Sequence, residues 1–397
     1  MLLLASLSTL APAADWPQWR GPNRDGKSAE TGLLDVWPAG GPRLLWKAKG
    51  LGEGYSSFSV AGGRLYTMGQ QGSQEFVLAL DVSTGQPLWK FAFGTAFSND
   101  RGNGPRGTPT VDGNRVFALA GDGTLSALEA ATGKRLWGYN IVERFKGGVP
   151  HWGISESPLV EGGLLIVTPG GNGASVVALD KATGEPVWKS QSDRAGYSSA
   201  LAFDAGSTRG LAVLTASGAM GLNAKNGELL WRYDKVANRT ANVATPIVAG
   251  GHVFVSTDYG TGCALLKLTP EGGSVKASEV YFNRDMRNHY TTSVLVGDYL
   301  YGYSSGILTA MKFLTGEVAW KDRSVGKGNC VYAEQRLYCM GEEGKVGLIE
   351  ATPAAYREKS RFEIPRGAYP TWTPPVISDG KLYLREQDNL YCYGIRK

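Results

Sequence analysis

Cysteine and histidine, on which many metal and haem sites depend, are scarce in this chain. Its 397 residues include four cysteines and three histidines, and no Cys-x-x-Cys or Cys-x-x-Cys-His motif occurs. These absences exclude zinc sites with the usual cysteine spacing and c-type haem attachment. The histidines, His151, His252 and His289, lie far apart in the sequence, so we predict no metal site.

Charge and long apolar runs are also limited. Charged residues make up 19% of the chain, below the usual share, and the net charge is +5. No run of Lys and Arg marks a nucleic-acid-binding segment, so we expect no nucleic-acid partner. The N-terminal apolar stretch, residues 2–10, is far shorter than the roughly 20 residues that span a bilayer, and we expect no transmembrane segment.

The first residues resemble a secretory signal peptide. An apolar stretch is followed by small residues, and Ala11-Pro12-Ala13 fits a cleavage site, although the usual positive segment at the start is missing. We therefore predict a signal peptide over residues 1–13 and a periplasmic or secreted mature protein. No cysteine follows the cleavage site, so a lipid anchor at an N-terminal cysteine is not expected.

Glycine is abundant, with 55 residues, and a phrase that contains it recurs along the chain. The five copies are DVSTGQPLW (81–89), EAATGKRLW (129–137), DKATGEPVW (180–188), NAKNGELLW (223–231) and KFLTGEVAW (312–320). In every copy a Trp follows the Gly by four residues. A second phrase, of which VAGGRLY at 60–66 is one example, precedes each copy and predicts a hairpin turn between two strands.

The repeating unit predicts four antiparallel strands within about 40–50 residues, which is the period of a β-propeller blade. Gly supplies the positive φ of a tight turn, and the Trp lies on the outermost strand, where its ring can pack against the neighbouring blade. Degenerate outer strands near Tyr281 and Phe362 bring the number of units to eight. The Trp residues to which we assign this blade-docking role are Trp46, Trp89, Trp137, Trp188, Trp231 and Trp320.

The two ends of the chain complement each other. The last unit, near residues 373–394, lacks a fourth strand, whereas LLWKAK at 44–49 is a fourth strand with none before it. We expect the N-terminal strand to close the last blade, because a closed ring leaves no strand edge exposed. The predicted fold is all-β, a single eight-bladed β-propeller of four-stranded antiparallel blades over residues 43–397, and we expect a monomer.

Residues 14–42 form a predicted N-terminal strap that precedes the propeller. Its tryptophans, Trp16, Trp19 and Trp37, are expected to pack the strap onto the blades. The strap contains GPNRDGKS at 21–28, which matches the P-loop consensus. The strand before and the helix after that a P-loop requires are missing, so no nucleotide site is predicted.

A cysteine pair lies in the segment NCVYAEQRLYCMG. If Glu334 and Gln335 form a two-residue turn, Cys330 and Cys339 face each other across a hairpin. A disulfide in an oxidising compartment and a pair of buried thiols are both compatible with this spacing.

The A-x-D-x-x-T-G-x-x-x-W phrase resembles the tryptophan-docking motif of the pyrroloquinoline-quinone (PQQ) enzyme-like propeller superfamily. This superfamily holds quinoprotein dehydrogenases and non-catalytic members such as the outer-membrane assembly lipoprotein BamB. In the dehydrogenases, the quinone lies between a Trp and a disulfide of two adjacent cysteines, and Ca²⁺ binds nearby. No adjacent cysteine pair occurs here, so the resemblance implies a member without PQQ or Ca²⁺ and without catalytic residues.

Aligning the blades on their first hairpin predicts which residues ring one mouth of the central channel. We call the residues at the start of the eight innermost strands the mouth residues: Tyr55, Arg106, Ser155, Tyr197, Val243, Tyr290, Lys327 and Trp372. The next position along the chain holds Ser56, Gly107, Glu156, Ser198, Ala244, Thr291, Gly328 and Thr373. The candidate ligand- or partner-binding residues are Tyr55, Arg106, His151, Trp152, Glu156, Tyr197, Asn242, Tyr290, Lys327 and Trp372.

Longer loops before blades 2 and 3 raise one wall of this mouth, and such loops often carry binding residues. They and the loops of blades 5 and 6 contribute a basic rim that suits an anionic ligand or acidic partner. Its members are Arg101, Arg106, Arg144, Lys146, His151, Arg239, Arg284, Arg287 and His289.

Three functions fit these observations, and the fold alone does not separate them. The leading hypothesis is an exported, non-catalytic binding scaffold that presents its basic channel mouth to a cell-envelope protein or an anionic ligand, with no cofactor. The first alternative is a PQQ-dependent dehydrogenase with an atypical site, in which Glu156 is a Ca²⁺ ligand and Trp152 or Trp372 lies under the quinone. The second alternative is a polysaccharide binder that stacks sugars on Tyr55, Tyr197, Tyr290 and Trp372.

Overall fold

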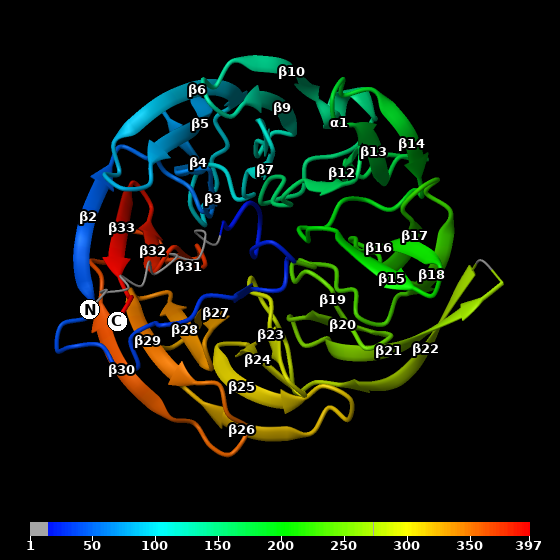
Figure 1. The fold of residues 1–397 in the computed structure, drawn as a ribbon. Helices are drawn as coiled ribbons and strands as arrows, with labels where there is room; N and C mark the ends of the chain where they lie inside the picture. Colours follow the sequence, from blue (N-terminus) through cyan, green and yellow to red (C-terminus); the bar gives the residue numbers. More distant parts are fainter. Residues whose placement is uncertain (1–14, 273) are drawn as a thin grey trace, which may run out of the picture.

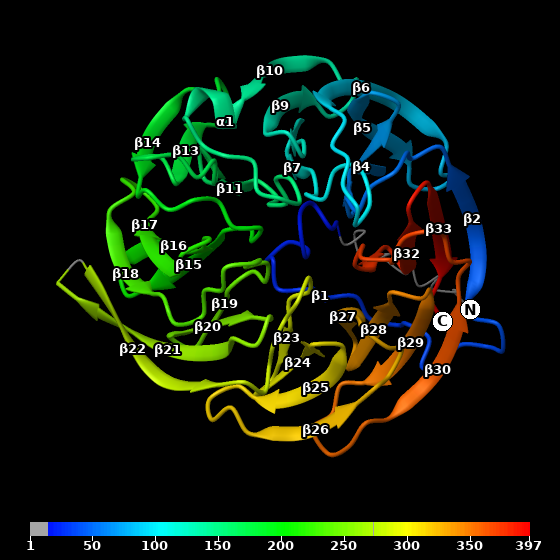
Figure 2. The same cartoon turned by 180° about the vertical axis from the view of Figure 1, so that it is seen from behind.

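The computed structural model describes residues 15–272 and 274–397. Its strands form eight antiparallel sheets arranged as blades around a central axis (Figures 1 and 2). The predicted all-β, eight-bladed propeller of four-stranded blades is therefore confirmed. The predicted signal peptide over residues 1–13 lies outside the described residues.

Each blade runs from a short inner strand near the axis to an outer strand at the rim. Blades 1 and 2 contain β3 (Ser59–Ala61), β4 (Arg64–Gln71), β5 (Gln74–Asp81), β6 (Pro87–Thr95), β7 (Thr110–Asp112), β8 (Arg115–Leu119), β9 (Thr124–Glu129) and β10 (Arg135–Asn140), after which comes the helix α1 (Ile141–Arg144). Blades 3 and 4 contain β11 (Leu159–Glu161), β12 (Leu164–Val167), β13 (Val176–Asp180), β14 (Pro186–Ser190), β15 (Leu201–Ala205), β16 (Thr208–Leu214), β17 (Ala219–Asn223) and β18 (Leu229–Tyr233).

The second half of the ring repeats this order. Blades 5 and 6 contain β19 (Ile247–Ala249), β20 (His252–Thr257), β21 (Gly262–Glu271), β22 (Ser274–Asn283), β23 (Val294–Val296), β24 (Tyr299–Ser304), β25 (Ile307–Lys312) and β26 (Val318–Asp322). Blade 7 contains β27 (Gly328–Ala333), β28 (Arg336–Gly341), β29 (Lys345–Glu350) and β30 (Glu358–Glu363), and blade 8 contains β31 (Val376–Ser378), β32 (Lys381–Glu386), β33 (Asn389–Gly394) and β2 (Arg43–Lys49).

The middle strands are covered on both faces by the neighbouring blades. In β9, for example, the four central residues are all buried, whereas the outer strand β10 has no fully buried residue. A short strand that is covered on both faces needs a continuous apolar run, which is what the middle strands show. The outer strands are more exposed, as the burial pattern of β10 shows.

The repeated Trp and Gly residues of adjacent blades contact each other. The Trp89 ring of blade 1 lies over Gly133 of blade 2, and its Nε1 donates to the carbonyl of Ala130 at 3.0 Å. Gly133 has a φ of +73°, and a Cβ there would lie 2.5 Å from the Trp89 ring. The turn thus needs glycine for its backbone conformation and for the space that the Trp occupies. The same contact recurs for Trp46 on Gly85, Trp137 on Gly184 and Trp188 on Gly227.

Blade 5 departs from this pattern, because a long hairpin of β21 and β22 replaces its T-G turn and projects from the ring (Figure 1). Trp231 of blade 4 lies against Gly221 of its own blade, and its buried Nε1 has no hydrogen-bond partner in the described part of the chain. Tyr281 on β22 replaces the usual Trp, and its hydroxyl donates to the Phe313 carbonyl of blade 6 at 2.9 Å.

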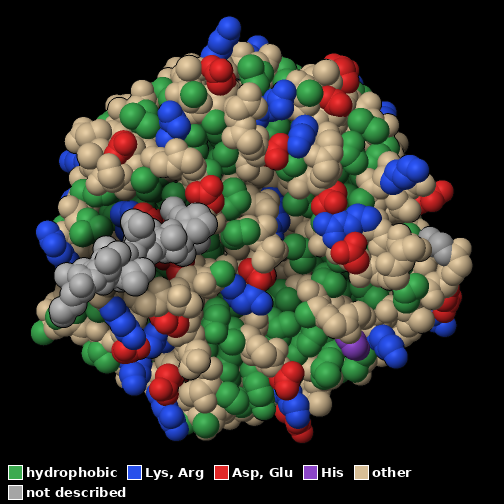
Figure 3. Space-filling view, in the orientation of Figure 1, with side chains coloured by type: hydrophobic (Ala, Val, Ile, Leu, Met, Phe, Trp, Pro, Cys, Tyr) green, Lys and Arg blue, Asp and Glu red, His purple; other side chains and the backbone are tan. Residues whose placement is uncertain are grey.

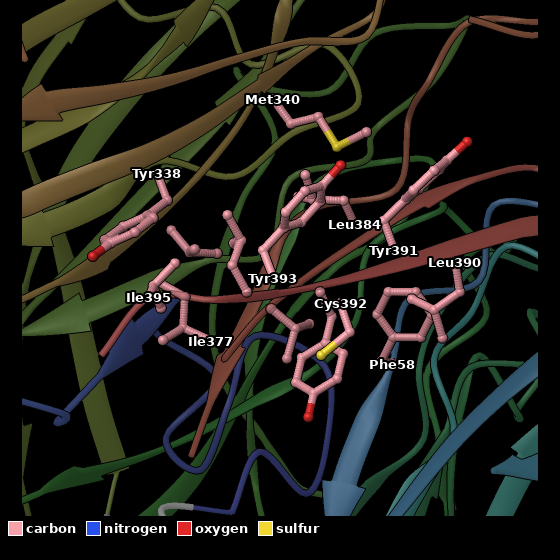
Figure 4. Close-up of a cluster of buried hydrophobic side chains, with 14 of the residues drawn as sticks. Phe58, Tyr338, Met340, Ile377, Leu384, Leu390, Tyr391, Cys392, Tyr393 and Ile395 are labelled. Atoms are coloured by element: carbon pink, nitrogen blue, oxygen red, sulfur yellow. The ribbon is translucent and has the colours of Figure 1, made fainter. Parts of the chain in front are cut away.

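The predicted closure by the N-terminal strand is confirmed. Strand β2 pairs antiparallel with β33 from Arg43 opposite Gly394 to Lys49 opposite Asn389. Because Trp46 of this strand also lies on Gly85, β2 joins blade 8 to blade 1. Figure 4 shows the apolar core of this junction, in which Phe58, Tyr338, Met340, Ile377, Leu384, Leu390, Tyr391, Cys392, Tyr393 and Ile395 gather.

The segment before β2 crosses the middle of the ring, where its dark-blue trace lies in Figure 1. Trp16 forms a bridge with Val60 of blade 1, and β1 (Lys27–Ser28) pairs in parallel with β27, adding a fifth strand to blade 7. The sequence analysis did not anticipate β1. The strap therefore contacts the inner strands of blades on different sides of the axis.

Two arginines anchor the strap in the channel. Arg20 donates to the carbonyls of Thr292 and Ser293 in blade 6 at 2.9 and 2.7 Å. Arg24 donates to carbonyls of blades 3 and 4 at 3.1 and 3.0 Å. Burial lowers the pKa of Arg20 to about 10 and that of Arg24 to about 9. Both remain charged at neutral pH, and the backbone carbonyls replace the water that each guanidinium loses.

The hairpin prediction for the cysteine pair is correct, but the disulfide is not formed in the structure. Cys330 and Cys339 are paired residues on β27 and β28, and both are buried free thiols. Opposite residues of antiparallel strands usually hold their Cβ atoms about 4.5–5.5 Å apart, whereas a disulfide needs about 3.8 Å. The pair therefore packs as two small apolar side chains between blades 6 and 7.

The face of the ring in Figure 3 carries side chains of both charges among hydrophobic and other residues. Figure 3 shows Lys and Arg interspersed with Asp and Glu over the face seen in Figure 1. Among the residues that the structure describes, no helix has the length and apolar character needed to cross a membrane.

We expect deletion of residues 14–48 to produce an aggregating protein, because β33 would lose its partner and expose its edge. Size-exclusion chromatography with light scattering of the deleted and intact proteins tests this. A soluble monomer whose melting temperature equals that of the intact protein would contradict the closure by β2.

Replacing Gly133 by Ala should destabilise the fold more than replacing Gly62 by Ala. Both positions have a positive φ, which costs an alanine about 1–2 kcal/mol, but only Gly133 lies under a Trp ring, whereas no atom lies within 4 Å of a Cβ at Gly62. We expect an extra loss of about 1–3 kcal/mol for Gly133→Ala in denaturant unfolding. Equal losses of unfolding free energy at the two positions would show that the contact between Trp89 and Gly133 does not contribute to stability.

Candidate functional site

A cavity of about 520 Å³ opens at one mouth of the channel. All eight mouth residues line it, one from each blade: Tyr55, Arg106, Ser155, Tyr197, Val243, Tyr290, Lys327 and Trp372. The alignment of the blades on their first hairpin thus corresponds to a ring of side chains in space. A volume of this size is within the range of pockets that hold small molecules.

Strand alternation decides which neighbouring residues reach the cavity. Two positions after the mouth residues, Ser199, Thr245 and Pro374 also line it. The residues between these two positions point the other way and are buried between blades. Crowding is severe there, since a Cβ on Gly107 would lie 2.4 Å from the carbonyl oxygen of Glu156.

Glu156 occupies one of the positions that point away from the cavity, so the prediction that it lies at the channel surface is wrong. Its side chain is 2% exposed, and its Oε1 accepts a hydrogen bond from the Thr168 amide at 2.5 Å. Burial raises the pKa of this carboxyl group to about 7, although the Thr168 hydrogen bond and the charge of Arg24 oppose the rise. Glu156 is therefore part of the blade packing and does not line the cavity.

Aromatic rings form much of the cavity wall. Trp372 lies between Tyr55 and Tyr290, with ring centroids 5.0 and 5.3 Å apart and interplanar angles of 33° and 30°. Trp152 and Tyr197 form a second pair, whose centroids are 5.7 Å apart. These rings come from five blades, so no single repeat could have built either group.

The cavity also contains three cationic side chains, two of which have anionic partners. Lys327 lies 3.3 Å from Glu342, and Arg101 lies 3.5 Å from Asp100. Arg106 forms no ion pair with any residue that the structure describes. The buried carboxyl group of Glu75 interacts electrostatically with Arg106, but burial raises the pKa of Glu75 to about 8, so this group is mostly protonated at neutral pH. Arg106 is therefore the cavity cation without an anionic partner.

Arg106 is held in place by its loop and by aromatic rings. Its guanidinium donates to the carbonyls of Gly104 and Gly102 at 2.9 and 2.8 Å and lies 5.3 Å from the Tyr55 ring centroid. Burial lowers its pKa, which means that its charge is poorly solvated. A preorganised cation with spare N–H groups and little solvation is well suited to bind an anion.

The strap supplies the floor of the cavity. Trp19 lines it, and its Nε1 donates to the hydroxyl of Thr245 at 3.0 Å. Behind Trp19, the two anchoring arginines fill the channel. The channel is thus a cup, and the WPQWRGPNRDG segment closes its inner end.

Other predicted residues lie outside the cavity wall. His151 is exposed, with its ring edge-to-face with Trp152 at 4.9 Å. Asn242 is buried and donates to the carbonyls of Thr215 and Ala216, so it holds the backbone of its loop. In the basic rim, Arg144 pairs with Glu185 at 2.6 Å outside the cavity wall.

The sequence analysis missed Tyr259 and Glu342 as site residues and gave His289 only a place in the rim. Tyr259 and Glu342 lie in the turns between the second and third strands of their blades. In an antiparallel blade these turns return to the same mouth as the starts of the inner strands, so this topology is the signal that would have identified them. The Glu342 Oε1 accepts a hydrogen bond from Trp372 Nε1 at 2.7 Å, and the His289 Nε2 lies 3.0 Å from the Tyr259 hydroxyl.

The residues present do not fit a calcium-bound quinone of the dehydrogenase kind. Glu342 is the only carboxylate among the described residues that line the cavity, and Lys327 and Trp372 already occupy it. Ca²⁺ takes about six to eight oxygen ligands. Nowhere in the described ranges do three or more His, Cys, Asp or Glu side chains gather as a metal site would require.

The family model described as outer membrane protein assembly factor BamB matches residues 32–144 and 142–322 of this chain. The chain belongs to this family. BamB of Burkholderia pseudomallei is 30% identical to it over 397 aligned positions, which cover 94% of this chain and 93% of the relative. BamB of Yersinia pestis is 25% identical, and the match covers 61% of this chain and 63% of that protein, less than two thirds of its length.

Solved structures of quinoprotein enzymes share the fold of this family member. The quinohemoprotein alcohol dehydrogenase of Comamonas testosteroni superposes with a TM-score of 0.65 and 15% identity, over 96% of this chain and 80% of that protein. The match to the family model and to the relative from Burkholderia pseudomallei confirms the predicted membership of the PQQ-like propeller superfamily, and the solved structure shares its fold. At this identity it shows the fold and not the activity.

The raised pKa of Glu156 predicts how its replacement changes stability with pH. Between the ordinary value of 4.5 and the folded value of about 7, the unfolded chain ionises while the folded chain keeps its proton. Folding stability contributed by this residue therefore falls as pH rises through that window. We expect the melting temperature of Glu156→Gln relative to the native protein to increase from pH 4.5 to pH 7. A melting-temperature difference between variant and native protein that does not change with pH would contradict the raised pKa of Glu156.

Proposed function

We propose that this chain is an exported, non-catalytic binding scaffold whose binding face is the cavity-bearing mouth. The proposal includes a signal peptide over residues 1–13, a periplasmic or secreted location and a monomeric unit of strap (14–42) and propeller (43–397). The observation that carries it is the cup itself, which combines a closed floor, an aromatic wall and an uncompensated, preorganised Arg106.

The partner in this proposal is a cell-envelope protein segment or another anionic ligand at the mouth. Family membership supports a protein partner, since the relatives are named as assembly factors of outer membrane proteins. Electrostatics supports an anionic group, because the unpaired charge of Arg106 lies inside the cavity, where screening by solvent is weak. Of the alternatives, the sugar-binding function is favoured by the aromatic wall of Tyr55, Trp372 and Tyr290.

Capture of envelope proteins by the immobilised mature chain tests the mouth as binding face. We expect the double variant Arg106→Gln/Lys327→Gln to retain about tenfold less of any partner that the native chain enriches, because charged hydrogen bonds contribute about 1.5–3 kcal/mol. The matched control is Arg357→Gln/Lys359→Gln, which removes the same charge from the outer strand β30 and its preceding turn.

Equal capture by the native chain and the mouth variant would place the binding face elsewhere on the ring. The dehydrogenase alternative is tested in parallel by dye-linked oxidation of alcohols and sugars after adding PQQ and Ca²⁺, and we expect no turnover. Turnover that depends on PQQ would show that the protein is an enzyme and would contradict the proposed non-catalytic scaffold.

A further inference from the structure

The cup contains polar atoms that are buried without a partner. Trp152 Nε1 and His289 Nδ1 belong to residues that line the cavity, and neither has a hydrogen-bond partner among the described residues. Both nitrogens are closed off from solvent, so a ligand or water in the cavity reaches them only if their side chains turn toward it. Buried polar atoms in folded proteins are nearly always satisfied, which favours such a movement when a polar ligand binds. The indole N–H can only donate, whereas the neutral imidazole can donate or accept.

His289 is neutral near pH 7, which keeps it available for both roles. Burial, and secondarily the charge of Lys327, lower its pKa below the ordinary value. Ser155, Ser199 and Thr240 also line the cavity. The Ser155 hydroxyl donates to the Gly153 carbonyl at 3.3 Å and keeps its capacity to accept, whereas the Ser199 hydroxyl accepts from the Ser157 amide at 2.8 Å and keeps its capacity to donate. The cavity wall therefore offers dispersed donors and acceptors of the kind that several hydroxyl groups of one ligand would satisfy.

The aromatic rings of the wall select the shape of the ligand. Ring faces carry partial negative charge, so they attract the weakly positive C–H groups on the face of a sugar ring as well as other flat groups. In the group of Tyr55, Trp372 and Tyr290 the ring contacts are 5.0 and 5.3 Å, and Trp152 with Tyr197 forms the second group. Arg106 and Lys327 lie over the outer rings of the first group, so a sugar would meet only the ring surface that these contacts leave open. The cavity of about 520 Å³ has room for one or two sugar rings.

The charged side chains of the cavity wall indicate which net charge a ligand should have. Two of the three cations in the wall have anionic partners, and Arg106 is the unpaired one among the described residues. One carboxylate would neutralise it in a charge-assisted pair. PQQ carries three carboxylates, so two of its charges would have no counterpart in this cup.

We infer that the cup binds a pyranose ring with one carboxylate, such as the uronate end of an acidic glycan. The carboxylate pairs with Arg106, the sugar faces lie against the aromatic wall, and the hydroxyls reach the unpartnered indole and imidazole nitrogens. This inference rests on the proposed function, because it takes the mouth as the binding face. An acidic peptide would satisfy Arg106, but its chain offers neither a flat C–H face nor clustered hydroxyls.

Calorimetric and Trp-fluorescence titrations of the mature chain test the inference, with galacturonate and digalacturonate compared with galactose and galactobiose. We expect the acidic sugars to bind at least tenfold more tightly than their neutral counterparts, since one charged hydrogen bond contributes about 1.5–3 kcal/mol. Arg106→Gln should abolish this preference while neutral-sugar binding remains. Trp372→Leu should weaken both classes, and Arg144→Gln, a rim arginine outside the cavity wall, should change neither.

Further probes separate the outcomes. Acetate that binds as tightly as galacturonate would show a bare anion site and overturn the sugar inference. A short Asp- and Glu-containing peptide that binds more tightly than digalacturonate would overturn it too, but would support the protein-binding scaffold. If no sugar binds while Arg106→Gln/Lys327→Gln still lowers capture of an envelope protein, the sugar inference is wrong and the proposed function stands. Melting temperatures of all variants show whether a loss of binding reflects unfolding.

Discussion

The pairing of β2 with β33 is the interaction on which the rest of this molecule depends. The four antiparallel strands of seven blades come from contiguous sequence, but the eighth blade needs a strand from the other end of the chain. That strand also places Trp46 on Gly85 of blade 1, so one element completes a sheet and continues the series of Trp contacts round the ring. Once the ring is closed, the starts of the inner strands face a common axis and the mouth residues form one wall.

The strap uses the space that closure creates. An eight-bladed ring leaves a channel lined by strand ends, where backbone carbonyls are available. Arg20 and Arg24 place their guanidinium groups among these carbonyls, while Trp19 faces the opposite way into the cavity. The same segment therefore stabilises the centre of the propeller and converts an open channel into a cup. Loss of Arg20 would leave unpaired carbonyls in blade 6, and loss of Arg24 would leave them in blades 3 and 4.

The cup differs from the quinone site of propeller enzymes in its electrostatics. Its wall has one unpaired cation and a single carboxylate that is already bonded, so it lacks the oxygen ligands for Ca²⁺. The fold that it shares with a dehydrogenase fixes where a ligand can enter, but the side chains at the mouth decide which ligand is stabilised there. The inferred uronate ligand would offer these side chains one negative charge, a flat ring face and several hydroxyl groups.

Much of this architecture could be read from the sequence, because the T-G turn and its Trp repeat at blade spacing and report local conformation directly. Counting these phrases predicted eight blades, the closing strand and the identity of the mouth residues. The role of Arg20 and Arg24 and the short strand β1 were not predictable, since each depends on contacts with blades distant in the sequence.

The sequence by itself thus determined the repeating unit and the mouth residue at the start of each innermost strand. Hydrogen bonding and side-chain alternation within a blade are local, so they follow from nearby residues. Tertiary structure decided which of these residues share a surface. Glu156 and Trp372 were both candidates at the mouth, yet the packing of neighbouring blades buries Glu156, whereas Trp372 lines the cavity. Only the closed ring brings Arg106, Lys327 and Glu342 into the wall of one cavity. There Lys327 pairs with Glu342, and Arg106 stays without an ion pair among the described residues.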